Sequence, residues 1–160
     1  MWIVRICLDV SGENFSPKAL LPELSGSFIV FSSHEPADLM LMRPGTYEYG
    51  CLSILAPSKI AIPEHPQLAD YENWYLDFIE QHKEVMARGG VTEINLVMDV
   101  FHSGGQCNFE IFSKDGLKKI GRHGVALPIS FYSSRDDQIV DLLRDAKYPE
   151  GVIKDFVDQG

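Results

Sequence analysis

The strongest constraint on the fold is a long amphipathic segment with marked ends. Between Gln67 and Arg88, apolar side chains recur at spacings of three and four, which is typical of a helix with one face in a core. Three prolines lie in the preceding stretch, 56–66, and Gly89-Gly90 follows the last periodic residue and ends the helix. Such a helix needs an extended apolar surface to pack against, and a sheet supplies one.

Alternating apolar and polar residues on both sides of this helix predict the strands of that sheet. Residues 2–10 and 91–101 alternate with a period of two, which indicates half-buried strands. The continuous apolar run 28–31 predicts a second and more central strand, and 46–55 predicts a third. These four segments give the predicted sheet its apolar face.

A β-hairpin is predicted directly after the strand 91–101. His102-Ser103-Gly104-Gly105 is a glycine-containing turn, and 107–111 alternates again. The hairpin therefore adds a strand next to 91–101.

The remaining elements are marked by capping residues. Ser16-Pro17 starts a short helix, and Ser113 caps another. Residues 125–131 predict a further strand, and Pro128 within it favours an edge position. Ser134 starts a last helix, and the tail predicts one more helical turn.

The order of these elements is β-α-β-β-α-β-β-α-β-α. Its first six members match the ferredoxin-like βαββαβ pattern, and the hairpin extends that core. We therefore expect an α+β fold with a mostly antiparallel sheet of about six strands and helices packed on one face. With 160 residues and no linker or repeat, the chain is expected to form one domain, 1–160.

Composition limits the compartment and the partners. Cys7, Cys51 and Cys107 are widely spaced and form no Cys-x-x-Cys pair, so we expect reduced thiols and a cytoplasmic protein. No apolar run is long enough to span a membrane, and the net charge of −9 disfavours nucleic acid as a partner. The same charge attracts a basic protein, although it also serves solubility alone. The oligomeric state stays open.

Motifs for catalysis, metals and cofactors are missing from the sequence. It contains no Gly-x-Ser-x-Gly elbow and no glycine-rich phosphate loop, and its five histidines are isolated from one another. His82 lies on the apolar stripe of the long helix, which indicates a hydrogen-bonded core histidine. We therefore expect no catalytic residue, no metal site, no cofactor and no enzymatic activity.

The candidate binding residues lie on the long helix. There are five of them, four acids and one aromatic residue, and no base lies between 70 and 80: Asp70, Glu72, Trp74, Asp77 and Glu80. An acidic face with aromatic neighbours predicts a docking surface for a basic protein. The alternative is the solvated side of a core helix.

Three stretches of the sequence carry a resemblance to a known family. They are Asn14-Phe15-Ser16-Pro17 after the first strand, the long helix leading into 91–101, and 109–132 with its closing helix and strand. In these the chain resembles the bacterial family called domain of unknown function 4279. The proline-rich stretch 57–66 departs from that pattern.

The resemblance implies no catalytic motif, so no functional residue is carried over from the family. Small acidic proteins of this general kind are often immunity proteins that neutralise a cognate toxin, which is an analogy. We therefore expect a non-enzymatic protein-binding domain of the immunity type, with a basic toxin domain as its partner. The alternative is a small-molecule-binding protein or an enzyme with an unrecognised site.

Overall fold

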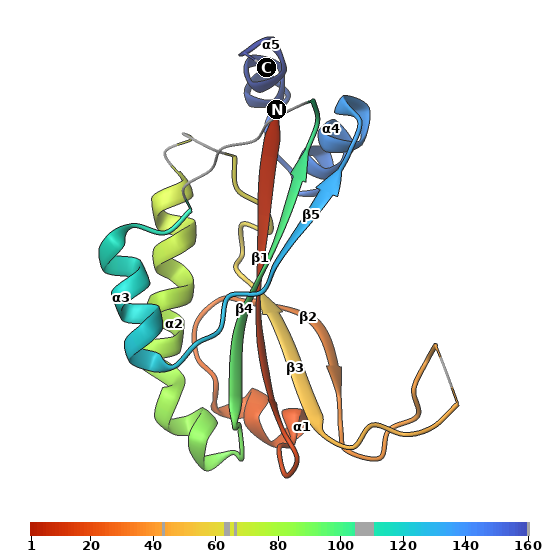
Figure 1. The fold of residues 1–160 in the computed structure, drawn as a ribbon, viewed down its shortest axis with the longest axis vertical. Helices are drawn as coiled ribbons and strands as arrows, with labels where there is room; N and C mark the ends of the chain where they lie inside the picture. Colours follow the sequence, from red (N-terminus) through yellow and green to blue (C-terminus); the bar gives the residue numbers. More distant parts are fainter. Residues whose placement is uncertain (43, 63–64, 66, 105–110, 160) are drawn as a thin grey trace.

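The computed structural model describes residues 1–42, 44–62, 65, 67–104 and 111–159, and Figure 1 shows its elements. The elements in chain order are β1 (Trp2–Gly12), α1 (Pro17–Leu20), the 3₁₀ turn η1 (Leu21–Glu23), β2 (Ile29–His34), β3 (Gly50–Leu55), α2 (Gln67–Arg88), β4 (Glu93–His102), α3 (Lys114–His123), β5 (Ile129–Ser133), α4 (Asp136–Asp145) and α5 (Glu150–Gln159).

The described strands form one mixed sheet in the order β2-β3-β1-β4-β5. The pairs β2–β3, β3–β1 and β1–β4 are antiparallel, and β4–β5 is parallel. The fold is therefore α+β with a mostly antiparallel sheet, as predicted. The described sheet has five strands, where about six were expected.

One predicted strand has a different position in the sheet, and another lies outside the described residues. The run 28–31 was expected to be central, but β2 lies at the edge of the sheet, and four of its six residues are exposed. An apolar run alone does not distinguish a central strand from an edge strand. The second strand of the predicted hairpin, 107–111, lies almost wholly within 105–110, outside the described residues.

The main core lies between one face of the sheet and α2. The even-numbered residues of β1 from Val4 to Val10 are buried here, which is the face that the alternation predicted. α2 contributes Tyr75 and Ile79, both fully buried, and it has the predicted bounds. α3 packs beside α2 on the same face and buries Ile120 (Figure 1).

A second core lies on the opposite face of the sheet. Ile3 of β1 packs there with Ile139 and Leu143 of α4 and Ile153 of α5. The prediction that all helices pack on one face is therefore wrong. The reason is local: the odd-numbered Ile3 is as apolar as its even-numbered neighbours, so this end of β1 is buried on both faces.

Caps define the helices that follow β4. The Ser113 hydroxyl accepts from the Gly116 N–H at 3.0 Å and starts α3, as predicted, and Gly124 ends it with a φ of 67°. α4 has Arg135 at its N-cap, one residue later than predicted. α5 is a helix of 10 residues, where a single turn was expected.

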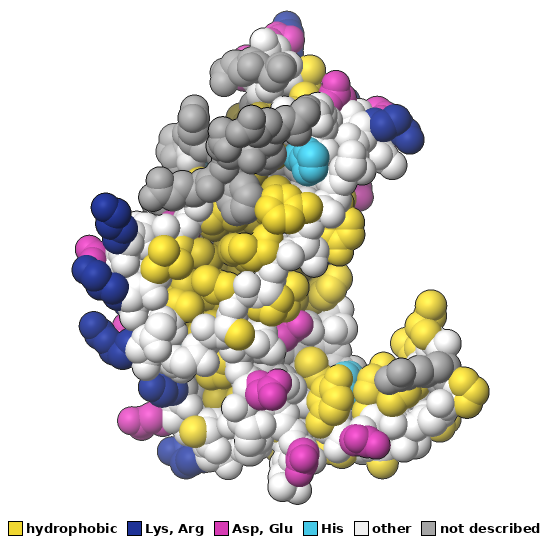
Figure 2. Space-filling model, in the orientation of Figure 1, with side chains coloured by type: hydrophobic (Ala, Val, Ile, Leu, Met, Phe, Trp, Pro, Cys, Tyr) yellow, Lys and Arg dark blue, Asp and Glu magenta, His cyan; other side chains and the backbone are white. Residues whose placement is uncertain are grey.

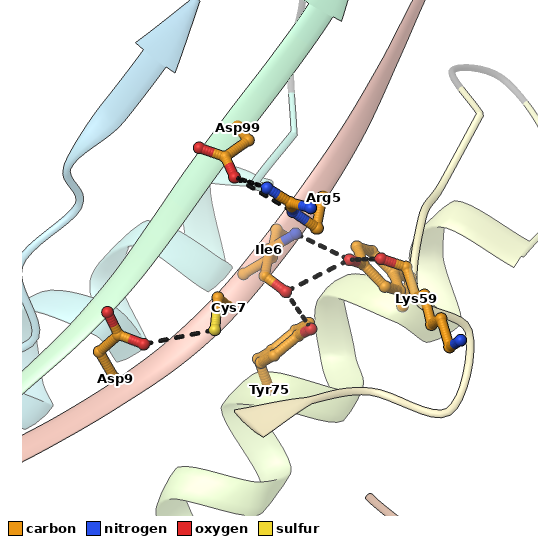
Figure 3. A network of polar contacts seen from close by, with 8 residues as sticks. Arg5, Ile6, Cys7, Asp9, Lys59, Tyr75 and Asp99 are labelled. Atoms are coloured by element: carbon orange, nitrogen blue, oxygen red, sulfur yellow. Dashed lines mark hydrogen bonds and ion pairs between the residues drawn. The ribbon is translucent and has the colours of Figure 1, made fainter. Parts of the chain in front are cut away.

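β3 separates from β1 before Leu8, and we call the gap between the two chains at Ile6 the fork. Tyr71 and Tyr75 of α2 lie in the fork, and Figure 3 shows Tyr75 beside Ile6. β3 pairs with β1 only from Leu8 onward, and beyond the fork Ala61 forms an isolated bridge with Val4. Between these points the Ile6 N–H donates to the Tyr71 hydroxyl at 2.8 Å, and the Tyr75 hydroxyl donates to the Ile6 carbonyl.

The same hydroxyls also hold the chain that leaves β3. Tyr75 accepts from the Ala56 N–H at 3.0 Å, and Tyr71 donates to the Lys59 carbonyl at 3.2 Å. Burial raises the pKa of both phenols far above their ordinary value, so the hydroxyls stay protonated. The Ile6 N–H and carbonyl are therefore both paired, although β3 does not pair with β1 at this residue.

His82 is a hydrogen-bonded core histidine, which confirms its interpretation from the sequence. The side chain is buried, its Nδ1 lies 2.9 Å from the Phe78 carbonyl, and its Nε2 accepts from the Ser25 N–H at 3.0 Å. The first contact requires a proton on Nδ1 and the second requires a bare Nε2, so the neutral imidazole fits the site. His82 thus ties α2 to the segment after η1.

We predict that Tyr75→Phe destabilises the protein by about 1–3 kcal/mol, because the buried Ala56 N–H and Ile6 carbonyl both lose a partner. The matched control is Tyr132→Phe on β5, whose ring is 45% exposed and which should change stability by less than about 0.5 kcal/mol. Urea denaturation measures both. Equal stability of the two variants would contradict the role of the fork.

Candidate functional site

A broad depression lies on the half of the sheet that α4 and α5 leave bare. It has a volume of about 480 Å³, and the odd-numbered residues of β1 meet the facing residues of β3 and β4 in it. Its described lining is Asp9, Ser11, Gly12, Glu13, Tyr49, Cys51, Thr92, Glu93 and Asn95. The floor is continuous sheet, because Asp9 pairs with Ser53 on one side and Asn95 on the other.

The charge of this depression has one sign. The described lining contains three carboxylates, on Asp9, Glu13 and Glu93, and no lysine, arginine or histidine. Its other ionisable groups are the Tyr49 phenol and the Cys51 thiol. Within the described part of the chain, none of the three carboxylates forms an ion pair. The depression therefore presents uncompensated negative charge to solvent, which attracts cationic groups.

The cysteines of this face are not activated nucleophiles. The Cys7 thiol donates to Asp9 Oδ1 at 3.3 Å, and burial together with this carboxylate raises the pKa of Cys7 well above its ordinary value. Burial and the same Asp9 also raise the pKa of Cys51. Both thiols therefore stay protonated at neutral pH, and the thiol form is a poor nucleophile and metal ligand.

Among the described residues, no group of three or more histidine, cysteine and acidic side chains is placed to hold a metal ion. Beyond its upper end Arg5 is bound to Asp99 and lies over the Phe31 and Phe101 rings, so its charge is already paired (Figure 3). The arrangement is suited to binding cations.

Two of the five residues predicted as a binding surface have structural contacts. Glu72 Oε1 accepts from the Ser113 N–H at 3.1 Å and so fixes the start of α3 against α2. Trp74 is half-buried, stacks on Phe78 at a centroid distance of 4.9 Å and packs against the main core. These contacts account for both side chains without a partner.

The other three predicted residues lie together on the solvent side of α2. Asp70, Asp77 and Glu80 are all exposed, and helical geometry places them opposite the buried stripe. They lie on the opposite side of the sheet from the depression, since α2 covers the other face. Their role in binding stays a prediction.

Sequence reasoning did not find the acidic depression. Asp9 and Glu93 lie far apart in the chain, at polar positions of the two alternating segments 2–10 and 91–101. Their proximity depends on the register of β1 with β4, which places Asp9 opposite Asn95 and Ser11 opposite Glu93. The alternation indicated that these faces were polar, but it did not indicate that they formed one surface.

Among the described residues, no helix is long and apolar enough to cross a bilayer.

Comparisons of the chain with protein-family models, with curated proteins and with solved structures gave no match. The resemblance to domain of unknown function 4279 therefore stays a prediction.

We predict that Glu72→Ala destabilises the protein by about 1 kcal/mol, because the Ser113 N–H at the start of α3 loses its acceptor. Asp77→Ala, which removes an exposed carboxylate from the same helix, should stay within about 0.5 kcal/mol of the wild type. Thermal and urea unfolding report both values. If the two substitutions have equal effects, Glu72 does not anchor α3.

Proposed function

We propose that this chain is a non-enzymatic protein-binding domain that receives a basic segment of its partner in the acidic depression. The observation that carries the proposal is the combination of Asp9, Glu13 and Glu93 with no base in the described lining. Arginine and lysine side chains are the protein groups that complement such a surface.

Shape and packing support a polypeptide partner. The depression is open and lies along the paired strands β3, β1 and β4, so an extended or helical segment can lie across it. Tyr49 on its rim offers an aromatic surface for an arginine or an aliphatic side chain, and tyrosines are enriched in interfaces. The net charge of −9 adds long-range attraction to a basic protein.

A finer proposal is that the protein belongs to the immunity type, which blocks a cognate toxin by covering it. It is supported by the acidic charge and by the analogy with small acidic inhibitors. The test is co-expression with the protein encoded by the adjacent gene. Immunity predicts that wild type restores growth and that Glu93→Lys does not; equal growth with and without the wild type would contradict it.

A small polycation is the second candidate ligand. The volume of about 480 Å³ lies within the range of small-molecule sites, and the acidic lining suits a polyamine. The openness to solvent favours a larger partner, because small molecules are held in sites that enclose most of their surface.

For the fold, we propose that β2-β3-β1-β4 is the ferredoxin-like core predicted from the sequence. The order of these strands and their antiparallel directions support this. β5 then extends the core beside β4.

We predict that an arginine-rich peptide perturbs the backbone NMR signals of Asp9, Glu93 and Asn95. The double variant Glu13→Gln with Glu93→Gln should bind this peptide about tenfold more weakly, or by about 1.4 kcal/mol. The matched control is Asp77→Gln with Glu80→Gln, which removes the same charge from the exposed side of α2 and should leave binding unchanged. Spermine in a parallel titration distinguishes a small polycation from a peptide.

Each outcome of this titration decides between surfaces. Perturbations at Asp70, Asp77 and Glu80, with binding lost in the α2 control, would transfer the site to α2 and overturn the depression. Tight binding of spermine together with weak binding of the peptide would favour the small-molecule alternative.

A further inference from the structure

Residues 35–49, which connect β2 to β3, form a structured projection that we call the arm; residue 43 lies outside the described part. The Ala37 N–H donates to the Tyr47 carbonyl at 2.8 Å, and the Met40 N–H donates to the Gly45 carbonyl at 3.0 Å. Figure 1 shows the arm extending away from the lower end of the sheet. These bonds join the two sides of the arm, and a segment that is ordered in advance loses less entropy when it docks.

Aromatic rings fasten the arm to the sheet. His34, the last residue of β2, stacks on Tyr47 at a centroid distance of 3.6 Å and meets the edge of Tyr49 at 5.4 Å. Burial lowers the pKa of His34, which keeps its ring neutral at neutral pH. The arm is therefore anchored at its base and free at its tip.

The tip of the arm exposes apolar side chains to solvent. Leu39 is 79% exposed, Leu41 93% and Met42 97%, and these are the highest values among the large apolar side chains of the described residues. A scattered exposed leucine is ordinary, but three on one projecting tip are typical of a contact surface.

A second apolar surface lies between α3 and β5. We call it the waist patch, and its exposed members are Leu117 at 49%, Ile129 at 44% and Phe131 at 54%, with the half-buried Leu127 in the connecting segment. Figure 2 shows hydrophobic side chains gathered in this region, and others on the arm at the lower right.

The charges beside these two apolar surfaces are opposite. α3 carries four bases, Lys114, Lys118, Lys119 and Arg122, and one acid, a net charge of +3, whereas α2, α4 and α5 are all net negative. Figure 2 shows dark blue side chains along the left edge, where Figure 1 places α3. In the sequence, the arm has three acids, Glu35, Asp38 and Glu48, and one base, Arg43, a net charge of −2.

We propose that the protein self-associates, with the arm of one copy docked on the waist patch of a second copy. The leucine and methionine tip covers the apolar patch, and the acids of the arm face the bases of α3. The net charge of −9 on each copy does not prevent this, because charges farther apart than a Debye length of about 8 Å are screened at physiological salt.

The chemistry of the arm disfavours other occupants. The arm is net negative, whereas an anionic membrane surface attracts clusters of bases. A second copy supplies both surfaces that complement the arm, the apolar waist patch and the bases of α3. We call one arm docked on one waist patch a joint. If each copy docks its arm on the other, two joints close a symmetric dimer.

The test is sedimentation velocity of the full chain across a concentration series, where the wild type should self-associate with a dissociation constant below about 1 mM. Leu41→Gln with Met42→Gln should weaken association at least about tenfold, and Leu117→Gln with Ile129→Thr should do the same. Val157→Gln on α5, 38% exposed, is the apolar control and should change nothing.

Charge is tested by a matched pair of acid-to-amide substitutions. Glu48→Gln on the arm should weaken association, whereas Glu84→Gln on the exposed side of α2 should leave it unchanged. Because these positions are exposed, circular dichroism should show a folded protein in every case.

Mixing the arm variant with the patch variant gives the sharpest result. Each alone lacks one half of every joint, but the patch variant still has an intact arm and the arm variant still has an intact patch. The mixture should therefore associate one-to-one through a single restored joint.

Three results would overturn the proposal. The first is a wild type that stays monomeric at about 1 mM, which would indicate that the tip binds a different protein. The second is association that persists in both double variants, and the third is a mixture of the two variants that does not associate. Glu93→Gln, which affects only the depression, should not alter self-association. Failure here is therefore independent of failure of the proposed partner site.

Discussion

The hydrogen bonds of Tyr71 and Tyr75 with Ile6 are the interactions on which the rest of the structure depends. β1 pairs with β4 from Trp2 to Ser11, while its other neighbour, β3, leaves it half-way. A buried backbone N–H and carbonyl would otherwise be unpaired at that point, at a cost comparable to a lost hydrogen bond each. Two phenols from one helix satisfy both groups and fix α2 against the sheet.

The fork divides the sheet into two halves with different surroundings. Beyond it, the segment that leaves β3 returns beside Val4, and Ile60 joins α4 and α5 over the second face. Before it, the three antiparallel strands are covered on one face by the main core, and their second face remains polar. The candidate site exists because the chain covers one half of this face with helices and leaves the other half bare.

The surface is organised by charge around this frame. The bare half collects carboxylates without bases, α2 places a second acidic stripe on the opposite side, and α3 alone among the longer described helices is basic. Two buried polar side chains have structural partners: His82 bonds to Ser25, and Asp99 bonds to Arg5. The structure thus separates groups that hold the fold from groups that are free to meet a partner.

The sequence by itself determined the elements whose causes are local. Periodicity and flanking glycines and prolines located α2 from Gln67 to Arg88, Ser113 marked the start of α3, and alternation identified the buried face of β1. Only the tertiary structure decided that β2 lies at an edge, that helices cover both faces, that Glu72 and Trp74 are held by α3 and the core, and that Asp9 and Glu93 share a depression. The physical reason is that strand register, strand order and helix docking depend on contacts between residues far apart in the chain, whereas periodicity and capping depend on neighbours.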